Sequence, residues 1–214
     1  MSTPTQPSRE TPGGFWDKRY VRPDYAFGTT PNHFLAAQRH LLRPGMRALV
    51  PGDGEGRNGV WLAEQGCRVT SVDASGLGVE KARKLAGERG VTIDACQADV
   101  TKWSWPVGTF DMVASIYLHW APAERVILHT RMRDALAPGG LLLLEAYTPR
   151  QLEHRARGNV GGPPDAERLF TREMLAQDFT ALEILQLDEA VVVLAEGTRH
   201  VGPSSVVRLV ARRL

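Results

Sequence analysis

The stretch Ala48-Leu49-Val50-Pro51-Gly52-Asp53-Gly54-Glu55-Gly56-Arg57-Asn58 decides the fold of this chain. It is an apolar run that ends in a glycine-rich turn and leads into a helical pattern, and a second apolar run after it ends at Asp73. Because glycine has no Cβ and tolerates a positive φ, such a turn lets a ligand touch the backbone. An acidic residue about 20 positions further on is where a pair of ribose hydroxyls is usually held. The chain is therefore expected to bind an adenosine-containing small molecule.

The composition is that of an ordinary globular protein. Of the 214 residues 43% are hydrophobic and 23% are charged, and 26 basic and 24 acidic side chains leave a net charge of +2. This near balance offers no electrostatic reason for a nucleic-acid or anionic-membrane partner, and no apolar run reaches the ~18 residues of a membrane span. Cys67 and Cys96 have neither CxxC nor zinc spacing, so no metal is expected. We expect both in the core of a cytoplasmic protein, where thiols stay reduced.

Residues 1–14 are polar, rich in Pro, Ser and Thr, and without the apolar centre of a signal peptide. We expect them to be a disordered lead. Residues 15–214 suit a single domain with a sizeable core.

Apolar strand patterns alternate with helical patterns along most of the chain. The expected strands cover Met46–Val50, Arg68–Val72, Val91–Ala95, Phe110–Ile116 and Leu141–Leu144, and the helices between them cover Pro31–Leu42, Arg57–Gln65, a segment that ends near Gly90, and Pro122–Leu136. Continuous apolar strands of this kind indicate a parallel sheet covered by helices on both faces, hence an α/β fold. Thr171 is expected to cap a further short helix. The runs 182–194 and 205–213 then predict an antiparallel hairpin.

The glycine turn leaves the identity of the adenosine ligand open. Gly54-x-Gly56-x-x-Gly59 matches the dinucleotide fingerprint, although a lone match is weak. Three features oppose a nicotinamide enzyme. The glycines begin at Gly52 and form a broad turn, about 45 residues precede the first strand, and Asp99 follows the third strand, where it suits the amino group of adenine. An NAD-dependent oxidoreductase and a non-catalytic cofactor-binding module remain the alternatives.

From Phe15 onward the chain resembles the class I S-adenosylmethionine-dependent methyltransferases. The resemblance rests on five motifs in order, which are Val50–Gly56, Asp73, Ala98-Asp99-Val100, Phe110–Val113 and Leu136–Gly140. Gly56-Arg57-Asn58 with Trp61-Leu62-Ala63 resembles the tellurite-resistance-type branch, which is akin to the thiopurine methyltransferases. The segment 15–45 is similar to the part of that branch that covers the cofactor, and it is called the lid below.

The resemblance implies a three-layer Rossmann-like methyltransferase fold with a seven-stranded, mostly parallel sheet whose last strand is antiparallel. It implies methyl transfer from S-adenosylmethionine, with S-adenosylhomocysteine as product, to a small acceptor such as a thiol or a metalloid oxyanion. The scaffold serves many acceptors, so the fold does not fix the substrate. The oligomeric state stays open.

The resemblance also implies a set of cofactor-binding residues. The turn glycines meet the methionine part, Asp73 accepts both ribose hydroxyls, and Asp99 accepts the adenine amino group. Aromatic rings of residues 16–27 close over the cationic sulfonium, and Arg19 pairs with the carboxylate. The full expected set is Trp16, Arg19, Tyr25, Gly28, Gly52, Asp53, Gly54, Gly56, Arg57, Asn58, Asp73, Ala74, Ser75, Asp99, Val100, Ser115 and Ile116, with Tyr20 and Phe27 as further lid aromatics.

The acceptor side of the site is expected near the ends of the fourth and fifth strands. A general base is needed only if the acceptor holds its proton at pH 7, and His119 is the best-placed candidate, although a packing or cofactor-contact role is the alternative. Tyr147, Arg150 and His200 are the expected acceptor contacts, and the loop 161–164 is the expected acceptor wall.

Overall fold

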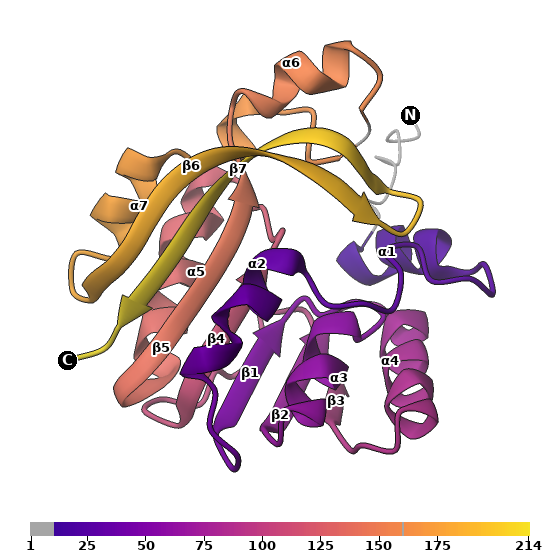
Figure 1. Ribbon diagram of the computed structural model, residues 1–214, viewed down its shortest axis with the longest axis vertical. Coiled ribbons are helices and arrows are strands. Elements are labelled where there is room, and N and C mark those ends of the chain that lie inside the picture. The colour runs from indigo at the N-terminus through magenta and orange to yellow at the C-terminus, as the bar shows by residue number, and fades with distance from the viewer. Residues whose placement is uncertain (1–10, 160) are drawn as a thin grey trace, which may run out of the picture.

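A seven-stranded sheet in the order β3-β2-β1-β4-β5-β7-β6 forms the middle layer of the computed structural model, which describes residues 11–159 and 161–214 (Figure 1). Strands β1 to β5 pair in parallel, whereas β7 is antiparallel to both β5 and β6. This confirms the predicted sheet and its C-terminal hairpin. The strands are β1 (Arg47–Pro51), β2 (Arg68–Asp73), β3 (Asp94–Gln97), β4 (Phe110–Ile116), β5 (Leu136–Tyr147), β6 (Glu183–Glu196) and β7 (His200–Arg212).

Helices cover both faces of the sheet. One apolar cluster joins the sheet to α2, α3 and α4, and a second joins its other face to α5 and α7. No helix in the described part of the chain is both long and apolar enough to cross a bilayer. The helices are α1 (Pro12–Tyr20), α2 (His33–Ala37), α3 (Arg57–Glu64), α4 (Gly76–Glu88), α5 (Pro122–Ala135), α6 (Gln151–Ala156) and α7 (Arg172–Asp178), with 3-10 turns η1 (Gln38–Leu41) and η2 (Ala166–Arg168).

Several predicted elements differ from the structure at their boundaries, and the reason is clear for β3 and β5. β3 begins at Asp94 instead of Val91, because β2 pairs with it only from Thr70 onward, and the Val91 N–H bonds to the Ala86 carbonyl at the end of α4 instead (3.0 Å). β5 extends to Tyr147, well past the predicted Leu144, because its antiparallel pairing with β7 continues that far.

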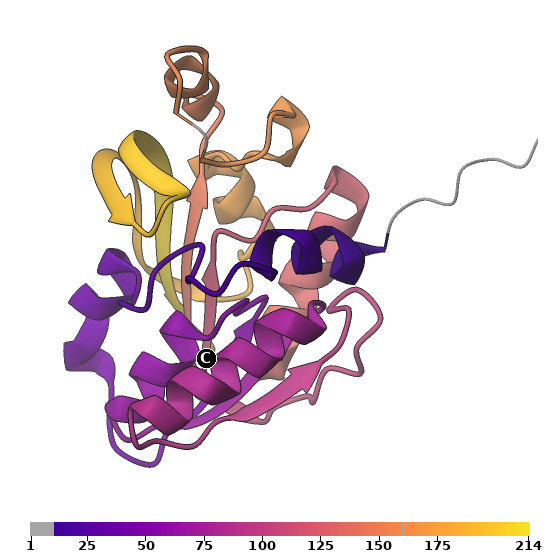
Figure 2. The same ribbon diagram turned by 90° about the vertical axis from the view of Figure 1, so that its right-hand side faces the viewer.

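The N-terminal segment contains a helix that the sequence patterns did not indicate. Thr11 caps α1, since its side-chain oxygen accepts a hydrogen bond from the Gly14 N–H (3.2 Å). Residues 12–14 therefore belong to α1, and residues 1–10 of the predicted lead lie outside the described residues. α1 lies over the N-terminal end of α4, beside the carboxyl edge of the sheet (Figure 2). The first part of the predicted covering segment thus lies beside the glycine turn, where Tyr20 faces Gly54.

Candidate functional site

The glycine turn after β1 has a backbone conformation and close neighbours that leave no room for a side chain. Gly52, Gly54 and Gly56 have φ values of 63°, 60° and 88°, which L-residues rarely adopt. A Cβ on Gly54 would lie 2.5 Å from the Tyr20 hydroxyl, and a Cβ on Gly52 would collide with the Leu118 side chain. Tyr20 therefore faces this turn from the lid, and Leu118 faces it from the segment after β4.

Asp73 ends β2 directly beside this turn. Its Oδ2 accepts the Gly54 N–H and its Oδ1 accepts the Ser75 N–H, both at 2.8 Å. The residue is only 6% exposed, and this burial raises the pKa of its carboxyl above the ordinary value, although the two backbone hydrogen bonds oppose the shift. A carboxylate offers about four acceptor positions, so two remain for other donors. These two remaining acceptor positions fit the two free hydroxyls of a ribose.

Two further carboxylates, which sequence reasoning missed, attach the lid to this region. Asp17 of α1 accepts the Ser75 hydroxyl (2.5 Å) and the Leu77 N–H (3.2 Å) at the start of α4. Glu55 accepts the Ala26 N–H (2.7 Å) and pairs with Lys81 of α4 (2.7 Å). Both partners lie far away in the sequence, so only the fold brings them together. Ala74, also expected at the site, approaches α1, since its carbonyl would lie 2.5 Å from a Cβ on Gly13.

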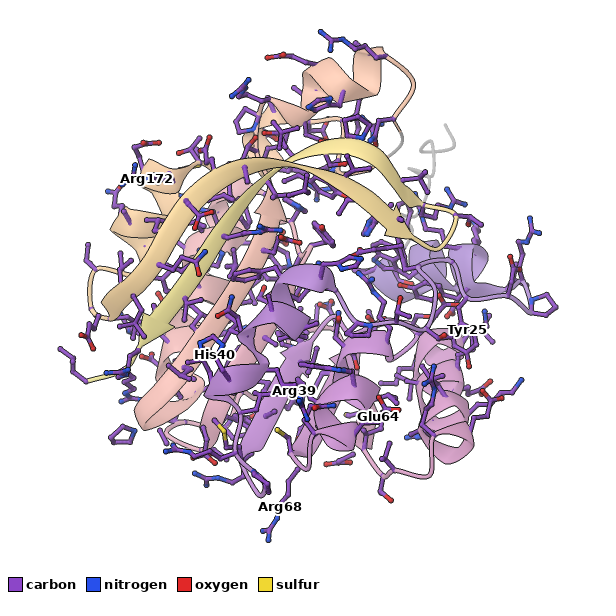
Figure 3. The ribbon with its side chains drawn as sticks, viewed as in Figure 1. Tyr25, Arg39, His40, Glu64, Arg68 and Arg172 are labelled. Carbon is purple, nitrogen blue, oxygen red and sulfur yellow. The ribbon has the colours of Figure 1, made fainter. Side chains whose placement is uncertain are left out.

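Three of the four predicted lid aromatics form one group. Trp16 stacks on Tyr20 with ring centroids 5.7 Å apart, and Phe27 lies 6.4 Å from each of them. Tyr25 is not part of this group. Its hydroxyl donates to the Lys81 carbonyl (3.4 Å), and its ring lies beside α4 (Figure 3). The Arg19 guanidinium lies 3.7 Å from the centroid of the exposed Phe15 ring and 5.2 Å from that of Trp16, and its pairing with the cofactor carboxylate remains a prediction.

The lid also contacts the turn between β6 and β7. Gly197 in this turn has a φ of 62°, and a Cβ there would lie 2.5 Å from both the Gly28 nitrogen and the Ala26 carbonyl oxygen. The Thr198 N–H donates to the same Ala26 carbonyl (3.0 Å). Gly28 itself has a φ of 72°. The predicted Gly28 thus serves a contact between the lid and the hairpin.

The side chains of three further predicted residues, Asp53, Arg57 and Asn58, have hydrogen-bond partners within the protein. The Asp53 carboxylate lies beneath the turn, where it accepts the Ser71 hydroxyl (2.8 Å) and the Gly59 N–H (3.2 Å), and burial raises its pKa to about 6. Arg57 and Asn58 begin α3. The Arg57 guanidinium pairs with Glu196 (2.8 Å), and the Asn58 side-chain oxygen accepts the Asn32 N–H (2.9 Å). Contacts of these three residues with a cofactor remain a prediction.

Asp99 follows β3 as predicted, and its Oδ1 caps its own turn. That oxygen accepts the Thr101 N–H (3.0 Å) and the Thr101 hydroxyl (2.7 Å). The adjacent Val100 carbonyl accepts the indole N–H of Trp105 (2.9 Å). Ser115 and Ile116 are the two buried last residues of β4. Contacts of these four predicted residues with a cofactor remain a prediction.

His119 does not suit the role of general base. Its Nδ1 donates to the Arg168 carbonyl (2.8 Å), and its Nε2 accepts the Tyr147 N–H (3.2 Å). Burial lowers the pKa of His119 to about 4, although the bond to Arg168 opposes the shift. Both nitrogens of this neutral ring are thus used by the backbone, which favours the packing role that the sequence left as the alternative. Arg150 is exposed at the start of α6, and its contact with an acceptor remains a prediction.

A buried polar network joins the lid residue Asn32 to the C-terminal hairpin. Glu196, at the end of β6, pairs with Arg57 (2.8 Å) and His200 (3.2 Å) and accepts the Asn32 side-chain amide (3.2 Å). Asn32 also donates to Glu145 of β5 (2.7 Å), and its own N–H donates to Asn58 (2.9 Å). This network links the start of α3, the lid, β5 and the C-terminal hairpin.

An aromatic group, formed by Tyr117, Tyr147 and His200, borders that network at the carboxyl edge of the sheet. Tyr117, which has a φ of 55°, stacks on Tyr147 at 4.7 Å and lies 4.5 Å from the His200 ring. A positive φ in a bulky residue is a strained conformation that is concentrated at functional sites. Within the described residues, the Tyr147 hydroxyl and Arg57 Nη1 are buried and have no hydrogen-bond partner.

Comparisons with known proteins agree with this geometry. Residues 48–140 match the family model described as "Methyltransferase domain". The chain is 30% identical over 189 residues to a ubiquinone biosynthesis O-methyltransferase of Methylocella silvestris, covering 81% of this chain and 73% of the relative. It is 29% identical over 227 residues to a thiopurine S-methyltransferase of Pseudomonas putida, covering 92% and 97% of the two chains.

A solved structure described as "Conversion of a Disulfide Bond into a Thioacetal Group during Echinomycin Biosynthesis" superposes with a TM-score of 0.74 at 22% identity, over 94% of this chain and 92% of that one. At this identity the likeness shows the fold alone. The named relatives are methyltransferases, so the nicotinamide oxidoreductase and the non-catalytic module are set aside, and S-adenosylmethionine is the methyl donor. The chain belongs to the class I S-adenosylmethionine-dependent methyltransferases.

Proposed function

We propose that this methyltransferase transfers its methyl group to a small thiol, with a metalloid oxyanion as a second acceptor of the same soft, polarisable kind. The observation that carries the proposal is the aromatic group of Tyr117, Tyr147 and His200 beside the lid residue Phe27, whose ring lies 4.5 Å from His200. Sulfur contacts aromatic rings favourably, by about 0.3–1.5 kcal/mol. A soft, polarisable nucleophile such as sulfur therefore suits these rings better than a hard oxygen or nitrogen nucleophile.

The relatives support the same class of acceptor. The chain aligns with nearly the full length of a protein named for S-methylation of thiopurines. The other relative is named as an O-methyltransferase, so a phenolic oxygen is the acceptor class against which the proposal must be tested.

In the proposal the cofactor lies against the glycine turn. The backbone of Gly52 and Gly54 approaches its methionine part, and Asp73 accepts the ribose hydroxyls with its two remaining acceptor positions. The Trp16, Tyr20 and Phe27 rings face the cationic centre, which an aromatic ring attracts by ~0.5–2 kcal/mol. Asp99, Val100, Ser115 and Ile116 complete the adenine side.

When bound, S-adenosylmethionine supplies a methyl group that is already electrophilic. The protein therefore has to hold the acceptor in line with that methyl group and to exclude water. α1, attached through Asp17, covers the turn, and the segment after β4 closes it from the other side through Leu118. We also propose that the protein acts on a small molecule and not on nucleic acid, which the near-neutral charge supports. We place it in the cytoplasm, because Cys67 and Cys96 are free thiols.

Transfer of a radiolabelled methyl group to a panel of acceptors tests this function. The panel contains alkyl and aryl thiols, selenite, tellurite, catechols and amines, and the Asp73→Ala variant serves as the control for cofactor-dependent transfer. Thiols are expected to be the best acceptors. Methylation of catechols or amines without methylation of any thiol or oxyanion would overturn the proposal.

A further inference from the structure

The pairing of His200 with Glu196 sets the protonation state of the imidazole ring. His200 opens β7, four residues after Glu196 closes β6, and its Nδ1 lies 3.2 Å from Glu196 Oε2. A carboxylate only accepts hydrogen bonds, so Nδ1 must carry the proton, which leaves the lone pair on Nε2 of the neutral ring. No residue in the described part of the chain hydrogen-bonds this Nε2. His119, by contrast, has both nitrogens engaged by the backbone.

Glu196 is held firmly in its ionised form. Burial alone would raise its pKa, since the residue is 1% exposed, but the hydrogen bond from His200 and the charge and hydrogen bond of Arg57 outweigh burial and lower the pKa to about 2. Asn32 donates to its other oxygen (3.2 Å). The carboxylate is therefore a fixed acceptor that orients the His200 ring.

The His200 ring lies where the cofactor side and the acceptor side of the site meet. It is 4.5 Å from Phe27 and 4.5 Å from Tyr117, and 5.7 Å from Tyr147. Phe27 is in turn 6.4 Å from Tyr20, which faces Gly54 of the glycine turn. The Phe27 and Tyr20 rings therefore connect His200 to the glycine turn through a chain of contacts. Burial is also the main cause that lowers the pKa of His200, although Glu196 opposes it, so the ring is neutral at pH 7.

We propose that His200 is the general base that takes the proton from the acceptor, and that Glu196 is the positioning residue that holds it for this task. The inference rests on the proposed thiol acceptor, because a free thiol has a pKa of about 8.5 and is mostly protonated at pH 7. The S–H proton passes to His200 Nε2 while the sulfur lone pair forms the new S–CH₃ bond. The methyl–sulfonium bond breaks, its electron pair stays on the departing sulfur, and the imidazolium returns its proton to water.

Two thiols of different acidity test this role. An alkyl thiol that is protonated at pH 7 needs a base, whereas an acidic aryl thiol that is already ionised does not. His200→Gln is expected to lower kcat/KM for the alkyl thiol about 100-fold or more, and for the aryl thiol by less than about threefold. Equal losses for both thiols would overturn the proposal, because a merely structural role would affect both alike.

His129 offers a matched control, since it is another buried histidine whose Nδ1 lies close to a carboxylate (Asp178, 2.7 Å), but on α5, packed against Phe170 and Phe179. His129→Gln should leave the ratio of the two kcat/KM values unchanged. A ratio that moves as far as in His200→Gln would show that the discrimination follows loss of stability and would overturn the assignment.

A measurement without acceptor separates this inference from the proposed function. Imidazole ¹⁵N spectra of the protein with S-adenosylhomocysteine, assigned by comparison with His200→Gln, should show a neutral ring that carries its proton on Nδ1 at pH 7. A proton on Nε2 at that pH would overturn the base whatever the acceptor. Absence of thiol methylation by the wild type would instead overturn the proposed function.

Discussion

Replacing Asp73 with alanine is the sharpest perturbation of the proposed cofactor site. The carboxylate keeps two acceptor positions beyond its bonds to Gly54 and Ser75, and we assign these to the two ribose hydroxyls. A hydrogen bond to a charged group contributes about 1.5–3 kcal/mol. Losing two at the lower end of this range costs about 3 kcal/mol, which corresponds to a Kd for S-adenosylhomocysteine that is about 100-fold weaker. Titration calorimetry measures this change directly.

The control for this variant is Asp53→Ala, in the glycine turn that Asp73 contacts. Asp53 also bonds a backbone N–H and a further donor, Gly59 and Ser71, but from beneath the turn. Both variants should lose folding stability to a similar extent, because each leaves buried donors unpaired at about 1–3 kcal/mol apiece. Only Asp73→Ala should lose the cofactor. An affinity of Asp73→Ala within threefold of that of Asp53→Ala would refute the assignment of the ribose to Asp73.

Three further predictions concern the turn, His119 and Arg57. Gly54→Ala should lower both stability and S-adenosylhomocysteine affinity, because its φ of 60° costs an L-residue about 1–2 kcal/mol and its new Cβ would meet the Tyr20 hydroxyl; unchanged affinity in calorimetry would contradict this contact. His119→Gln should destabilise most at pH 6.5 and above. The pKa of His119 is about 4 in the folded protein, below its ordinary 6.5, so acid favours the unfolded wild type. The difference in the free energy of unfolding between wild type and variant should therefore shrink by up to about 3 kcal/mol as the pH falls from 6.5 to 4. A difference that stays constant with pH in urea unfolding would rule this out. Arg57→Met should destabilise by about 3 kcal/mol because it leaves the buried Glu196 charge without its cation, and adding Glu196→Leu should recover part of that loss in thermal unfolding. Additive losses in the double variant would argue against the pairing.

The sequence predicts best what depends on neighbours along the chain. The path from β1 through Gly52 to α3 follows from an apolar run, a glycine turn and a helical period within twenty residues, and Asp73 follows from the length of that unit. The antiparallel hairpin follows from two strand patterns joined by a short link. Each of these signals is local, so no knowledge of distant packing is required.

The direction of individual side chains escapes such reasoning. Tyr25 and Phe27 are both lid aromatics two residues apart, yet one lies beside Lys81 and the other meets His200. His119 follows β4 as a base would, but the Arg168 carbonyl, 49 residues away, occupies its Nδ1. Nothing periodic in the sequence connects such partners, because the fold alone brings them together.

The contact of Gly197 with Gly28 has a consequence for the order of events in turnover. The lid and the hairpin turn touch with no room for a side chain between them, so the lid cannot move away from the glycine turn without either breaking this contact or taking the hairpin with it. The hairpin carries His200, so a lid that took the hairpin with it as the methyl donor entered would displace the proposed base until the lid returned. We therefore expect donor binding to precede acceptor binding, a compulsory order in which the proposed acceptor is ionised only after the donor is enclosed.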